Sequence, residues 1–162
     1  MDTFSQLDTV AQIAAALLGF FAVFIALSKS DGRFSESDRH FIQAIVLSAT
    51  LAIILSLLPR ALSLHFSEQF VWTVSAIAAI VLGGLAMLLV AWRQFHMSKE
   101  EAALVHWGWH LGAWSLGFVA AVCFVLAVVH ETETYAYYVS GVSALIPLGL
   151  FTFIGVVFRR FL

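Results

Sequence analysis

Charged side chains are scarce in this chain, and their scarcity indicates the class of protein. Only 11% of the 162 residues are Asp, Glu, Lys or Arg, while 62% are hydrophobic and the mean hydropathy is +0.97. Soluble domains carry about 25% charged and about 45–50% apolar residues. A soluble fold of this size would expose the excess as one large apolar patch. The composition therefore predicts an integral membrane protein whose main partner is the lipid bilayer.

The low net charge, the single cysteine and the lack of basic residues near the N-terminus each exclude one kind of feature. The net charge is only −2, which gives no strong field for nucleic acid, so no nucleic-acid partner is expected. The single cysteine, Cys123, rules out an internal disulfide. No Lys or Arg precedes the first apolar segment, so we interpret that segment as a retained helix rather than a secretory signal.

The apolar segments contain no Asp, Glu or Lys. Ion-coupled transporters normally need an ionisable group at membrane depth, and a retinal-binding protein needs a lysine there for its Schiff base. A hydrolase within the membrane would need a Ser/His or paired-Asp arrangement, which is also missing. We therefore expect no enzymatic activity, no catalytic residues, no metal and no cofactor.

Five apolar segments are long enough to cross a hydrocarbon core of ~30 Å, which takes roughly 17–25 helical residues. The predicted helices cover residues 10–27, 37–65, 68–95, 99–129 and 135–160. Capping-box spacings at Ser35/Asp38 and Ser98/Glu101 mark the starts of the second and fourth helices. The connecting segments are short, so the sequence predicts a single transmembrane domain over residues 1–162, an all-α bundle of five transmembrane helices.

The distribution of Lys and Arg predicts the orientation of the bundle. Seven of the eight basic residues fall on one side of the membrane, namely Lys29, Arg33, Arg39, Arg93, Lys99, Arg159 and Arg160. Basic loops stay in the cytoplasm, so the N-terminus is predicted outside and the C-terminus inside. Trp72 and Tyr138 are predicted to mark the outer interface. The segment Gly19 to Phe24, followed by a basic loop, is similar to many small bacterial membrane proteins, which predicts the bacterial inner (cytoplasmic) membrane.

The strongest candidate for chemistry is the cluster His106, His110 and Trp114. These residues are four apart, so they share one helical face. The spacing of His110 and Trp114 is similar to that of the viral proton channel in which a pore histidine is protonated above a tryptophan gate. Haem or metal binding, with His96 as a further ligand, is another interpretation. The favoured one is an aromatic belt with histidines at headgroup level.

Small residues at four-residue spacing are candidates for helix packing, because they let helix backbones approach closely where lipid offers no hydrophobic drive. They are Ala11, Ala15 and Gly19 in the first helix, Ser75, Ala79 and Gly83 in the third, and Gly108, Gly112 and Gly117 in the fourth. Most are expected to pack within the protomer. The fourth helix carries two such faces, so one is available for a second chain.

Two other positions have a predicted local role. Pro147 lies near the middle of the fifth helix, where it cannot donate to the carbonyl of Ser143, and a kink is expected. Arg60, near the outer end of the second helix, is expected to anchor at the headgroups or to pair with Glu68 or with an acidic residue of the last loop.

These observations favour a small polytopic membrane protein that acts by helix packing, without catalysis. It would work as a homo-oligomer or as an accessory subunit of a larger membrane complex. The alternative is an oligomeric ion or proton channel gated by His106, His110 and Trp114, and the third hypothesis is a haem- or metal-binding redox subunit.

Overall fold

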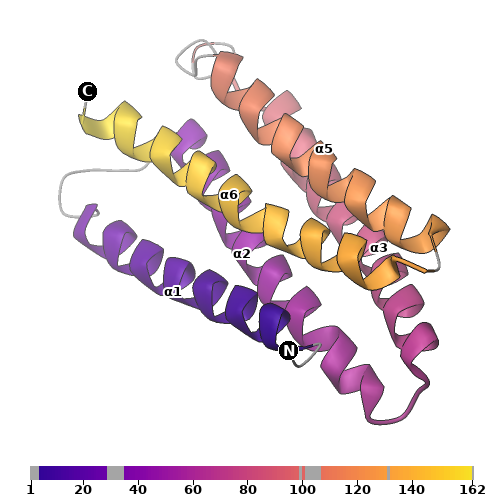
Figure 1. The fold of residues 1–162 in the computed structure, drawn as a ribbon. Coiled ribbons are helices and arrows are strands. Elements are labelled where there is room, and N and C mark those ends of the chain that lie inside the picture. The colour runs from indigo at the N-terminus through magenta and orange to yellow at the C-terminus, as the bar shows by residue number, and fades with distance from the viewer. Residues whose placement is uncertain (1–3, 29–34, 99, 101–106, 131, 162) are drawn as a thin grey trace.

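The computed structural model describes residues 4–28, 35–98, 100, 107–130 and 132–161. These residues form helices and no strands (Figure 1). The helices are α1 (Ser5–Ser28), α2 (Glu36–Ser63), α3 (Glu68–Phe95), α5 (Trp107–Val129) and α6 (Thr134–Phe161). Within the described residues, five helices are long and apolar enough to cross a membrane. This all-helical fold fits a multi-pass membrane protein.

The helix ends follow from local chemistry. The predicted capping box at the start of α2 is confirmed, because the Ser35 side chain accepts from the Asp38 N–H and the Asp38 carboxylate accepts from the Ser35 N–H. Helix α1 begins at Ser5, five residues before the predicted start, and Asp8 lies in its first turn. A carboxylate there is favoured by the positive end of the helix dipole. The predicted cap at Ser98 and Glu101 falls partly outside the described residues.

Short connections make consecutive helices antiparallel, and α2 and α6 occupy the middle of the bundle. Helix α6 packs against α5, α2 and α1, and also contacts α3. Helix α2 packs against α6, α1 and α3. In Figure 1, α6 crosses in front of α2, with α1 and α5 on either side of it. Helices α3 and α5 pack against each other on the side of the bundle away from α1 (Figure 1).

An aromatic core joins the helices near the end predicted to lie outside. Trp72 stacks with Phe4 at 5.8 Å between ring centroids and meets Tyr135 and Tyr138 at 5.0 and 5.8 Å. Trp72 is 4% exposed and Tyr138 is fully buried. Their rings fill the space between helices, and their place at the outer interface stays a prediction. At the opposite end, Phe153 packs edge-on against Phe21 and Phe24.

A proline inside α2 explains one buried hydrogen bond between helices. Pro59 has no N–H, so it cannot donate to the carbonyl of Leu55 one turn earlier. The hydroxyl of Tyr138 donates to that carbonyl instead, at 2.6 Å. Pro59, Leu55 and Tyr138 are all buried. The substitution of a side-chain donor for the missing backbone donor ties α6 to α2.

Because glycines on α5 and α6 have no side chain, aromatic rings can pack between these two helices. A Cβ at Gly112 would collide with the ring of Phe151, and one at Gly141 would lie 2.7 Å from Phe124 Cε1. A Cβ at Gly155 would lie 3.2 Å from the indole of Trp109. The close contact of α5 with α6 therefore depends on the missing side chains at these positions.

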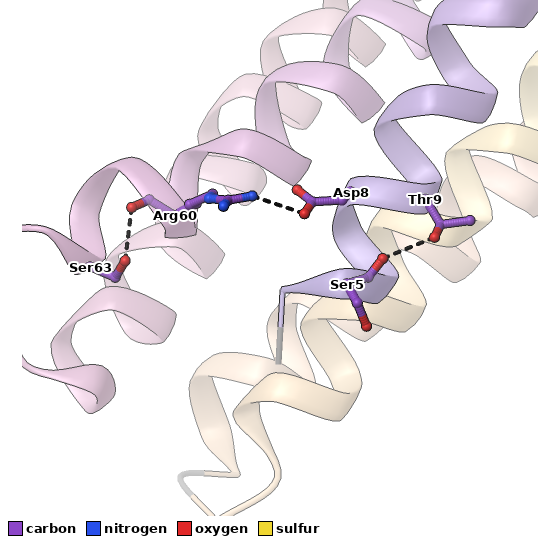
Figure 2. A network of polar contacts seen from close by, with 5 residues as sticks. All are labelled: Ser5, Asp8, Thr9, Arg60 and Ser63. Atoms are coloured by element: carbon purple, nitrogen blue, oxygen red, sulfur yellow. Dashed lines mark hydrogen bonds and ion pairs between the residues drawn. The ribbon is translucent and has the colours of Figure 1, made fainter. Parts of the chain in front are cut away.

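Figure 2 shows how Arg60 is held at the end of α2 predicted to lie outside. Its guanidinium pairs with the Asp8 carboxylate of α1 at 2.9 Å, whereas the sequence suggested Glu68 or an acidic residue of the last loop. Antiparallel packing of α1 on α2 brings the first turn of α1 beside the last turns of α2. The Arg60 side chain is 61% exposed, so this pair contributes at most about 1 kcal/mol.

Candidate functional site

A cleft lies between α2, α3, α5 and α6. Its volume is about 270 Å³. An apolar cavity of roughly 150 Å³ is large enough to bind benzene, so this cleft has room for a substantial apolar group. A second, apolar pocket between α1, α2 and α6 has a volume of only about 70 Å³.

The cleft exists because small residues face each other across it. On α3 they include Ala79 and Gly83, and on α5 they include Ala113, Gly117 and Ala121. No atom lies within 4 Å of where a Cβ at Gly83 would be, and a Cβ at Gly117 would meet only the Met87 side chain, at 3.6 Å. These predicted packing residues therefore leave a space between α3 and α5.

Polar side chains gather at one end of the cleft, the end predicted to be cytoplasmic. They are His40 of α2, Gln94 of α3, and His110 and Trp114 of α5. The Trp114 indole N–H donates to Gln94 Oε1 at 3.2 Å, which joins α5 to α3. The remaining walls are mostly apolar. Ser48 and Thr152 also line the cleft, but their hydroxyls donate to carbonyls of their own helices.

The two histidines are neighbours although they are far apart in the sequence. The rings of His40 and His110 lie 6.1 Å apart between centroids. The His110 ring also stacks on Phe41 at 6.0 Å, with an angle of 16° between the planes. His40 is 4% exposed, so it is enclosed by protein. Within the described residues, no hydrogen bond joins either imidazole to another group.

The structure places two of the three members of the predicted gate in this cleft. His110 and Trp114 both line it, and His106 lies outside the described residues. Both side chains are partly exposed, and the favoured interpretation, a histidine and tryptophan belt at the lipid headgroups, stays a prediction. His96 lies at the end of α3, exposed, with Nδ1 donating to the Trp92 carbonyl at 2.7 Å. Among the described residues, no group of three His, Cys, Asp or Glu side chains could hold a metal ion.

The other predicted residues are dispersed over the bundle. On α1, Ala15 and Gly19 are exposed and Ala11 is partly so, whereas the buried face of this helix carries Leu7, Val10 and Ala14. The small-residue stripe of α1 therefore lies beside the packing face rather than on it. Gly108 is exposed on α5.

On the remaining helices, Ser75 and Ala79 are fully buried. Glu68 is exposed at the start of α3, and Pro147 lies exposed within α6, which continues to Phe161.

Sequence reasoning missed His40 and Gln94 as site residues. A signal for both was present, because the predicted topology places the start of the second helix and the end of the third on the same side as His110. What the topology alone does not provide is the rotation of each helix about its axis. That rotation decides whether His40 faces lipid or the cleft.

Comparison with protein families, curated proteins and solved structures finds no match to this chain.

Proposed function

We propose that this protein is a non-catalytic membrane protein that holds the chain of a single-chain amphiphile in the cleft between α3 and α5. The observation that carries the proposal is the facing pair of small-residue surfaces, which keeps about 270 Å³ of space between packed helices. A cleft that is apolar over most of its length and polar at one end matches an amphiphile in chemical character.

The length of the cleft matches that of one alkyl chain. Its lining on α5 runs from His110 to Val125, about 22 Å at 1.5 Å per residue. Half of the hydrocarbon core is roughly 15 Å thick. A chain that enters at the polar end thus stays within the cleft for the depth of one leaflet.

A proton path is less well supported by the same geometry. A channel would need polar groups or water along its whole length. The cleft is lined by Ala79, Phe124 and Val125 at the end away from His110. These side chains offer nothing that would stabilise a proton or its hydration shell.

Native mass spectrometry of the full chain, released from a mild detergent, tests the proposal. The wild type should retain one amphiphile of a few hundred daltons per protomer. Gly117→Leu places a branched side chain in the cleft and should abolish the adduct. Gly19→Leu is the matched control, because Gly19 is exposed on α1 with no atom within 4 Å of its Cβ position. Equal retention by Gly117→Leu and wild type would refute the proposal.

Association with another membrane helix is a second candidate, as a homo-oligomer or as a subunit of a larger complex. It is favoured by Gly84, which is exposed on α3 with no atom within 4 Å of its Cβ position and so permits a close approach by a backbone. The same spectra test it, because Gly84→Leu should then convert an oligomer to protomers. A wild type that is monomeric and carries no protein partner would contradict this candidate.

A further inference from the structure

The polar end of the cleft has the composition of a binding site for an acidic group. His40 is 4% exposed and lines the cleft beside His110. Each imidazole carries two nitrogens that can donate or accept a proton. No described residue bonds to either ring, and no nitrogen of either ring is among the enclosed polar atoms that lack a partner. These nitrogens therefore keep accessible surface, which a ligand headgroup in the cleft could reach.

The basic side chain of Arg93 lies at this end of the bundle. Arg93 of α3 donates to the amide oxygen of Gln43, one turn from His40 on α2, and no carboxylate of a described residue forms an ion pair with this guanidinium. The Asp38 carboxylate, two residues before His40, accepts from the backbone N–H of Ser35 at the helix cap, 3.2 Å away. This end of the bundle therefore carries charges of both signs.

The chemistry of the lining distinguishes a carboxylate from a phosphate. Phosphate sites typically use Arg, Lys or several backbone N–H groups, because the group carries up to two charges. The described residues that line the cleft include no Arg or Lys; their polar side chains are imidazole, amide and indole groups and the hydroxyls of Ser48 and Thr152. A carboxylic acid and an imidazole can share one proton, so the pair enters the cleft without net charge, and this limits the cost of desolvation.

We propose that the amphiphile is a long-chain fatty acid, with its carboxyl group between His40 and His110; this inference rests on the proposed function. Its alkyl chain lies along Ala113, Gly117 and Ala121 of α5. The Trp114–Gln94 hydrogen bond closes the polar end on the α3 side.

Equilibrium binding to the full chain in nanodiscs tests this, with tritiated palmitic acid and tritiated hexadecanol as probes. The two have the same chain length and differ in the headgroup. Wild-type protein should bind palmitic acid at least about tenfold more tightly, which one charge-assisted hydrogen bond supplies. His40→Leu and His110→Leu should each weaken the binding of palmitic acid more than that of hexadecanol, and so remove this preference. Circular dichroism of each variant shows whether it is folded.

His65→Leu is the matched control, because His65 is exposed in the loop at the opposite end of the bundle. It should keep the preference for palmitic acid. Equal affinity of the wild type for the two probes would overturn the inference, as would a preference that survives in both histidine variants. Tighter competition by hexadecyl phosphate than by palmitic acid would replace the carboxylate with a phosphate. Binding of neither probe would refute the proposed function itself.

Discussion

Replacing Tyr138 by Phe removes one oxygen atom from the middle of the bundle. The hydroxyl donates to the Leu55 carbonyl at 2.6 Å, and both residues are fully buried. Pro59 supplies no N–H to that carbonyl, so the substitution leaves a buried acceptor without its donor. An unsatisfied buried group costs about 1–3 kcal/mol, while hydrogen bonds between membrane helices average about 0.6 and reach about 1.7 kcal/mol. We expect Tyr138→Phe to lower the unfolding free energy by about 1–2 kcal/mol.

A double-mutant cycle separates this mechanism from a general loss of packing. Pro59→Ala restores a backbone N–H that can donate to Leu55. In that background, Tyr138→Phe should cost about 1 kcal/mol less than in the wild type. The control is Tyr135→Phe, because the Tyr135 hydroxyl bonds to Gln6 at an exposed position, where water can replace it. That change should have little effect.

The measurement is reversible unfolding in mixed micelles with increasing dodecyl sulfate. Helix content is followed by circular dichroism, and Trp72, whose ring lies 5.8 Å from Tyr138, contributes a fluorescence signal near the mutated site. An equal cost of Tyr138→Phe with and without Pro59 would refute the reasoning. So would a cost for Tyr135→Phe as large as that for Tyr138→Phe.

Two other predictions test packing and orientation. Gly141→Ala should destabilise the bundle relative to Gly83→Ala by about 1–3 kcal/mol in the same unfolding assay, because only the first adds a Cβ 2.7 Å from a buried ring, that of Phe124. The gain in helix propensity of about 1 kcal/mol is common to both changes, so equal stabilities would contradict the packing account. In a cysteine-free background, Thr132→Cys should react with an impermeant thiol reagent applied outside intact cells, and Ser98→Cys should not. The reverse pattern would overturn the N-out orientation.

Most of the helix boundaries were predictable from the sequence because hydropathy and capping are local properties. Glu68–Phe95 matches the predicted third helix at both ends, and the capping box of Ser35 and Asp38 is formed as its spacing predicted. The start of α1 was missed because Ser5 and Asp8 are polar, and hydropathy alone does not separate a polar first turn from a loop.

Glycine and alanine spacing did not reveal which surfaces pack. The stripe with Gly19 is exposed and the face with Gly112 receives an aromatic ring, while Gly117 borders a cleft. A small residue permits close approach but does not decide what approaches. The partner depends on the rotation of each helix and on where large side chains such as Phe151 lie.

The sequence by itself indicated a membrane protein of apolar helices, because its few charges suit lipid and its long apolar segments can satisfy their backbone groups within a helix. It also singled out His110 and Trp114 as unusual. Only the tertiary structure decided that these two side chains face His40 and Gln94 across a cleft. The hydropathy of a helix can be read from its own residues. The contacts between helices depend on the shapes of side chains that are distant in the sequence.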